Sequence, residues 1–174
     1  MTNSELAILS LVSESPRHGY EIEQIIEQRG MREWTEIGFS SIYYLLKRLE
    51  QSGWIKSDLE TVAGRGPARR IYHITTAGQE TWQEGALRLL AEPQHVTSPF
   101  LLGLSNLPGL PVDASVGALL KYSQQLEERL DYLLARLEAQ RGAPAHVVAM
   151  FDFSRTMIRA ELTWVRQWIQ SNAG

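Results

Sequence analysis

The sequence contains no cysteine among its 174 residues, which excludes disulfide bonds, thiolate nucleophiles and cysteine-ligated metals. It also contains no uncharged apolar run that approaches the roughly 20 residues needed to span a bilayer. The first residues carry Glu5 and Glu14 and lack the basic segment that begins a signal peptide. We therefore expect a protein that lies in the cytoplasm and has no membrane partner.

Motifs that carry enzyme chemistry are missing as well. The chain has no GxSxG, no P-loop, no GxGxxG and no HExxH sequence. Its histidines His73, His95 and His146 do not share the spacing of metal ligands. We therefore predict that the protein is not an enzyme, with no catalytic residues, no cofactor, no cofactor-binding residues and no metal.

Net positive charge is a third absence, because 17 Lys and Arg stand against 20 Asp and Glu, for a net charge of −3. A wholly basic nucleic-acid-binding protein is excluded, but a local basic patch is not, since binding depends on where the charges lie. Residues 40–75 contain six cations and three acids, so this segment has a net charge of +3. The apolar share of 44% and the length suit one large or two small globular domains.

Three helical patterns open the chain. Thr2 and Glu5 have the spacing of a capping box at the start of the first helix, which Ser15-Pro16 ends. A second amphipathic helix is predicted over 19–29, with Gly30 after it, and a third opens after Gly38 and runs to about residue 52. Two short strands, 54–60 and 70–74, follow and are joined by a glycine-rich loop, which predicts a β-hairpin.

The remainder of the chain is predicted to be helical. A linking helix over 77–91 leads into a connector, 92–111, with a short helix around 100–105. Two long helices, about 113–141 and 145–170, are separated by Gly142-Ala143-Pro144, which predicts an antiparallel helical hairpin within 112–171. On the first of these helices leucines recur at nearly heptad spacing, namely Leu119, Leu126, Leu130, Leu133 and Leu137.

Three helices followed by a basic hairpin are the layout of a winged helix-turn-helix, whose third helix enters the major groove while the hairpin reaches phosphates or the minor groove. We therefore predict a mainly α protein with a small β-hairpin: a winged-helix DNA-binding domain at 1–76 and a helical dimerisation domain at 77–174. Candidate DNA contacts come from the first turns of the third helix and from a loop that has no acid between Thr61 and Ala77. They are Ser40, Ser41, Tyr43, Tyr44, Lys47, Arg65, Arg69 and Arg70.

Aromatic residues elsewhere are expected to pack. We expect Tyr20 in the core between the first two helices, and Trp34, Trp164 and Trp168 in the core or at an interface. Packing is also the favoured role for Trp82.

Five segments, in order and spacing, resemble the PadR family of regulators. They are HGYEI (18–22), SIYYLLKRLE (41–50), SGWI (52–55), GPARRIY (66–72) and ITTAG (74–78), and a weaker resemblance reaches ELTWV (161–165). The resemblance implies a homodimer that binds a pseudo-palindromic operator on double-stranded DNA, represses transcription, and is released by a small-molecule effector, often aromatic. Two positions depart from the family pattern, which often has a hydroxyl residue where this chain has His18 and Ser or Thr where it has Gly38.

Two other functions remain open at this point. One is a winged-helix adaptor that binds proteins and has lost DNA binding, against which the basic hairpin argues. The other is a MarR-type repressor, whose N- and C-terminal helices intertwine, whereas this chain has a separate C-terminal hairpin.

Overall fold

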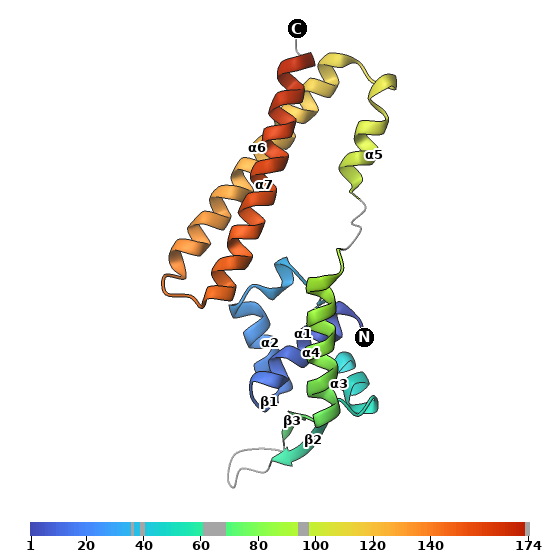
Figure 1. Ribbon diagram of the computed structural model, residues 1–174, viewed down its shortest axis with the longest axis vertical. Helices are drawn as coiled ribbons and strands as arrows, with labels where there is room; N and C mark the ends of the chain where they lie inside the picture. The colour runs from blue at the N-terminus through green and yellow to red at the C-terminus, as the bar shows by residue number, and fades with distance from the viewer. Residues whose placement is uncertain (36, 39–40, 61–68, 94–97, 173–174) are drawn as a thin grey trace. The chain divides into compact units, whose positions relative to one another are not determined.

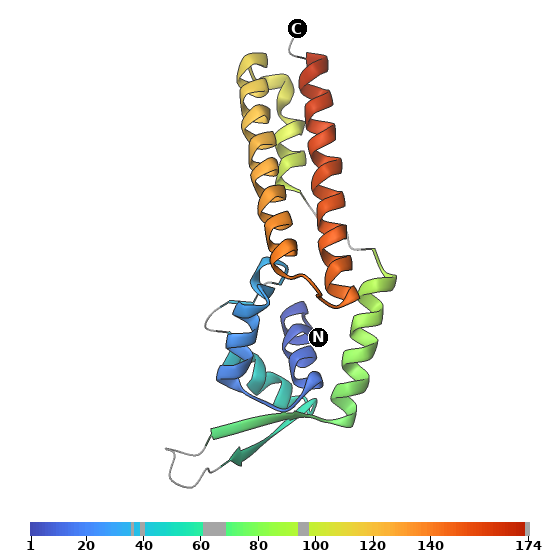
Figure 2. The same ribbon diagram turned by 90° about the vertical axis from the view of Figure 1, so that its left-hand side faces the viewer.

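The computed structural model describes residues 1–35, 37–38, 41–60, 69–93 and 98–172. The chain divides into two compact units, Met1–His95 and Val96–Gly174. Each unit is described by itself (Figures 1 and 2). No helix in these described ranges is long and apolar enough to cross a membrane.

The first unit is a winged helix, as predicted from the sequence. Its elements in order are α1 (Asn3–Glu14), β1 (Arg17–His18), α2 (Gly19–Gln28), the 3-10 helix η1 (Met31–Glu33), α3 (Ile42–Gln51), β2 (Ile55–Glu60), β3 (Arg69–Ile74) and α4 (Thr76–Ala91). Aliphatic side chains of α1, α2 and α3 form one continuous core, in which Ile8, Ile22 and Leu46 are fully buried. Because each helix turns its apolar stripe inward, the polar stripe of α3 is left outside.

The predicted hairpin is part of a three-stranded antiparallel sheet with the order β1-β3-β2. β2 and β3 pair along their whole length, from Ile55 opposite Ile74 to Glu60 opposite Arg69. The short strand β1, which the sequence analysis did not predict, pairs with the other edge of β3, where His18 lies opposite Ile71. The wing is thus joined through backbone pairing to the residues that begin α2.

Local caps are seen at several helix ends. Thr2 and Glu5 form the predicted capping box at α1: the Thr2 backbone N–H donates to Glu5 Oε2, and the Glu5 N–H donates to Thr2 Oγ1. α3 ends at a left-handed Gly53 (φ 73°), and the Trp54 N–H donates to the Leu49 carbonyl, which is a Schellman closure.

α3 begins at Ile42, and residues 39–40, which follow the predicted start at Gly38, lie outside the described residues. Ser41, directly before the helix, donates both its N–H and its hydroxyl to the Gly38 carbonyl.

α4 is held closely against the end of the wing. Thr75 caps the helix by accepting from the Gly78 N–H, and a Cβ at position 78 would lie 1.9 Å from the Trp54 carbonyl oxygen, so only glycine fits there. α4 also packs on α1, where Trp82 lies against the core. Within one chain α4 therefore belongs to the first unit, and its assignment to a dimerisation domain stays a prediction about contacts with a second chain.

The second unit contains α5 (Pro99–Ser105), the 3-10 helix η2 (Leu107–Gly109), α6 (Val112–Ala139) and α7 (Ala145–Asn172). The predicted antiparallel hairpin of α6 and α7 is seen in both views (Figures 1 and 2). Its core is small and centres on Leu126, Ile158 and Leu162. Phe100 fastens α5 to this hairpin, because its ring stacks on Tyr122 at 4.5 Å and meets Trp164 edge-on at 6.0 Å.

Candidate nucleic-acid interface

The outer face of α3 carries two phenols and a lysine. Tyr43 and Tyr44 are each 60% exposed, and Lys47 is exposed one turn beyond Tyr43. The opposite face supplies Ile42 and Leu49 to the core. This is the orientation predicted from the sequence, and it leaves the middle of α3 open to a ligand.

Tyr43 lies against the backbone of Gly19, the first residue of α2. A Cβ built at position 19 would come within 2.6 Å of Tyr43 Cε1, so the ring occupies the space that any other residue there would fill. Of the two predicted serines, Ser41 is partly buried, with its hydroxyl bonded to Gly38, and Ser40 lies outside the described residues.

α3 is fastened to α1 by an ion pair that the sequence analysis did not predict. Arg48 Nε lies 3.0 Å from Glu5 Oε1, and the Glu5 side chain is only 4% exposed. The same carboxylate closes the capping box of α1, so its second oxygen is also satisfied. Arg48 therefore holds the helix in place, and its guanidinium also lies over the Tyr44 ring at 5.8 Å.

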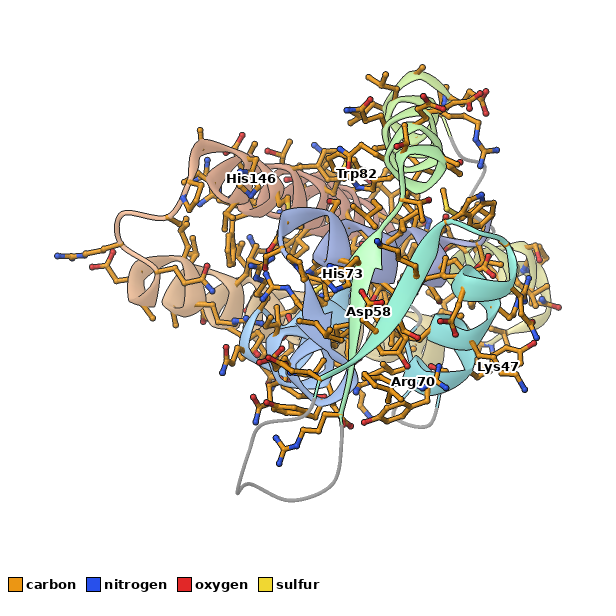
Figure 3. The ribbon with its side chains drawn as sticks, turned by 90° about the horizontal axis from the view of Figure 1, so that it is seen from below. Lys47, Asp58, Arg70, His73, Trp82 and His146 are labelled. Atoms are coloured by element: carbon orange, nitrogen blue, oxygen red, sulfur yellow. The ribbon has the colours of Figure 1, made fainter. Side chains whose placement is uncertain are left out.

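The wing arginines that the structure describes have partners within the chain, although the loop itself contains no acid. Arg70 Nη1 donates to Ser57 Oγ at 3.0 Å and lies 3.6 Å from Glu50 Oε2 on α3. Ser57 in turn donates to Glu50 Oε1 at 2.5 Å. Arg65 lies outside the described residues. In Figure 3, Lys47 points away from α3, whereas Arg70 lies between the wing and α3.

Tyr20 is not the core residue that we expected. It is 39% exposed, and its ring stacks on His18 at 5.5 Å while the Arg69 guanidinium lies 5.3 Å above it. Trp34 is likewise 54% exposed, and so does not pack in the core of its own chain.

His18 joins α2 to the wing. Its backbone N–H donates to Glu21 Oε2 at the start of α2. Its Nδ1 donates to the Arg70 carbonyl at 2.9 Å, because a carbonyl oxygen can only accept, and its Nε2 lies 3.1 Å from Glu60 Oε2. The sequence motif around His18 marked this residue, but nothing in its spacing revealed these contacts.

Among the described residues, some of the basic groups near α3 are therefore paired with acids, and others are not. The three acids of the segment are each near a basic group: Glu50 is near Arg70, Asp58 lies 3.5 Å from His73, and Glu60 is near His18. Lys47 and Lys56 are exposed and form no ion pair with any residue in the part of the chain that the structure describes. Burial raises the pKa of the Tyr72 phenol beneath this surface, although Arg70 partly opposes the shift.

Comparison with known proteins finds one family model and one curated relative. The model of the PadR-like transcriptional regulator family matches residues 8–84. An uncharacterised protein of Lysinibacillus sphaericus is 32% identical over 97 residues, which are 56% of this chain and 86% of that protein.

Solved structures of low identity share the fold over nearly the whole chain. Bacillus subtilis PadR in complex with p-coumaric acid matches with a TM-score of 0.84 at 17% identity, covering 99% of this chain and 100% of that chain. The same protein in complex with operator DNA matches with a TM-score of 0.78 at 18% identity, covering 96% of this chain and 97% of that chain. The PadR-like regulator BC1756 of Bacillus cereus matches with a TM-score of 0.67 at 18% identity, covering 98% of this chain and 96% of that chain. The chain belongs to the PadR-like family of transcriptional regulators.

Proposed function

We propose that this regulator is a homodimeric repressor that binds a pseudo-palindromic operator, with α3 in the major groove and the wing on the flanking backbone. The observation that carries the proposal is the exposed face of Tyr43, Tyr44 and Lys47 on the third helix of a winged helix. Phenols and ammonium groups donate to phosphates and base edges, and the third helix is the one that such folds place in the groove. Ser40, Ser41, Arg65, Arg69 and Arg70 are proposed as further contacts.

The second unit is proposed to form the dimer. Outside its intrachain core, α7 carries a second apolar stripe of exposed residues at the three- and four-residue spacing of a coiled-coil seam: Met150, Phe153, Met157, Ala160 and Trp164. Pairing this stripe across a two-fold axis would remove it from water. The same symmetry would present two recognition helices to half-sites about 34 Å apart, which is one turn of DNA.

Release by a small aromatic molecule is proposed on the likeness to Bacillus subtilis PadR, which was solved both with operator DNA and with p-coumaric acid. A ligand that binds the free dimer better than the DNA-bound dimer lowers operator affinity by the ratio of its two affinities. Addition of p-coumaric acid to the protein–operator complex tests this part separately.

The main experiment selects DNA from a random pool with the purified full chain and then measures binding to the selected duplex at several salt concentrations. We expect enrichment of an inverted repeat and a log–log salt dependence of binding that reflects several phosphate contacts. A pool that remains random, with no salt-dependent shift of any duplex, would overturn the proposal in favour of a winged-helix protein adaptor.

A further inference from the structure

The segment His18-Gly19-Tyr20 lies where the wing meets α3, and its three residues make different contacts. Gly19 is in contact with α3, whereas His18 and Tyr20 are in contact with the wing. The rings of His18 and Tyr20 stack on one another, with centroids 5.5 Å apart, and both residues contact the wing.

On the side of α3, the absence of a side chain at Gly19 creates the seat for Tyr43. The Tyr43 ring lies so close to the Gly19 backbone that a Cβ there would come within 2.6 Å of Cε1 and 3.2 Å of Cζ. Gly19 does not have a positive φ, so its backbone conformation alone does not require glycine. The close approach of the Tyr43 ring is therefore what position 19 must accommodate.

On the side of the wing, His18 ties all three strands together. It belongs to β1, its Nδ1 donates to the Arg70 carbonyl on β3, and its Nε2 lies next to the Glu60 carboxylate on β2. His18 and Arg70 are 52 positions apart in the sequence. These contacts hold the loop end of the paired strands, where Leu59 lies opposite Arg70 and Glu60 lies opposite Arg69.

Tyr20 adds a contact to a candidate DNA-binding side chain. The Arg69 guanidinium lies above the Tyr20 ring, 5.3 Å from its centre. A guanidinium that rests on an aromatic face keeps its in-plane N–H groups available, so Arg69 can be held by Tyr20 and still donate to a phosphate. Tyr20 thus limits the positions that Arg69 can adopt before DNA arrives.

We propose that His18-Gly19-Tyr20 is a positioning element that sets the recognition helix and the wing relative to one another for operator binding. Gly19 places the Tyr43 phenol, and His18 and Tyr20 place the loop end of the wing strands together with Arg69. None of the three needs to touch DNA itself. The inference rests on the proposed function, since it assigns these residues a role in the DNA-binding surface described above.

The first test uses Gly19→Ala in the full chain, alone and combined with Tyr43→Phe, on the selected operator duplex. The new methyl group displaces an exposed ring and leaves the core intact, so we expect affinity to fall about tenfold with an unchanged melting temperature. Tyr43→Phe should then cost much less in the Gly19→Ala background than in the wild type. Gly117→Ala on α6 is the matched control, because a Cβ there has open space around it.

The second test concerns Tyr20. Tyr20→Leu should weaken operator binding severalfold, and it should have little further effect in an Arg69→Ala background. Tyr20→Phe keeps the aromatic face and should bind as the wild type does, because among the described residues the Tyr20 hydroxyl donates only to Glu21, at 3.5 Å. His18→Ala, which removes the contacts with Arg70 and Glu60 at the loop end of the wing strands, should reduce affinity for the operator more than affinity for a random duplex of equal length.

Different results would overturn the proposed function and the positioning role. If the wild type does not prefer the selected duplex to the random one, the proposed function is wrong. If the wild type does prefer it, but the effects at Gly19 and Tyr43 and at Tyr20 and Arg69 are simply additive, then the positioning role is wrong. A variant that loses affinity only in proportion to lost folded protein, measured by circular dichroism, also contradicts the positioning role.

Discussion

The two units of this chain differ in how much of their apolar surface they bury within one chain. The first unit closes a core within itself, with side chains such as Ile8, Ile22 and Leu46 at 0% exposure. The second buries little beyond a few side chains between α6 and α7, while Phe153 is 69% and Met157 55% exposed. A monomeric protein rarely leaves a continuous apolar stripe in water. This contrast supports the proposal that the second unit is completed by another copy of the chain.

The largest expected effect comes from placing charge on the open stripe of α7. Phe153→Glu with Met157→Glu should convert the dimer to a monomer, because two carboxylates would be buried without partners at the interface. Loss of bivalent binding should then reduce operator affinity by about 10²- to 10⁴-fold. Sedimentation velocity and operator titration measure the two effects.

The matched control for that change adds the same two charges elsewhere on α7. Thr156 and Thr163 are exposed and lie off the stripe, so Thr156→Glu with Thr163→Glu should remain dimeric. If both pairs of substitutions leave the dimer intact, α7 does not form the seam and the open face of the second unit has another use.

Core truncations sharpen the comparison at the level of stability. Leu46→Ala in the first unit should cost about 2–5 kcal/mol of unfolding free energy, because it leaves a cavity in a fully enclosed core. Leu126→Ala should weaken the second unit in a way that depends on protein concentration, since the proposed dimer would stabilise that unit by association. Chemical denaturation at two protein concentrations tests this, and equal concentration dependence in the two variants would contradict it.

Single cations in the two units should differ in their effect on DNA binding. Lys47→Ala removes an exposed ammonium group from the outer face of α3, and we expect a loss of roughly 1–3 kcal/mol in operator binding. The slope of log K against log salt should become shallower by up to about 0.9 for one lost phosphate contact. Lys121→Ala, on the exposed surface of α6, is the control and should leave both quantities unchanged.

The difference between the units also explains what the sequence could predict. Helix ends in the first unit depend on local signals. The capping box of Thr2 and Glu5 was predicted correctly, and so was the end of the third helix near residue 52, where Gly53 closes it. The strand β1 was not predicted, because a strand of two residues has no recognisable periodicity. It forms only by pairing with β3, which lies far along the chain. The exposed face of α3 followed from helical spacing, and its contacts with DNA stay a prediction.

Interactions between elements were the part that spacing could not supply. Glu5 pairs with Arg48, and Glu50 pairs with Arg70. Both ion pairs join elements that are distant in sequence. In the second unit periodicity revealed the leucines of α6, but it could not say that they would pack on α7 within one chain and leave the stripe of α7 outside. Which of two apolar stripes meets which partner is a question of tertiary packing.

The smallest expected effect is a pH dependence that comes from Tyr122 in the second unit. Burial, together with the hydrogen bond that the phenol donates to Glu161 at 2.5 Å, raises the pKa of Tyr122 to about 12. The unfolded chain releases this proton at a pH of about 10, so the protonated phenol favours the folded state. Its contribution to stability is fully present below pH 10 and is lost as the pH rises toward 12.

Wild-type protein should therefore lose stability over this interval more steeply than Tyr122→Phe, which retains the ring stacked on Phe100 but cannot titrate. Urea denaturation of both proteins between pH 8 and about pH 11 measures the difference, and parallel curves would show that the bond between α6 and α7 does not depend on the phenolic proton.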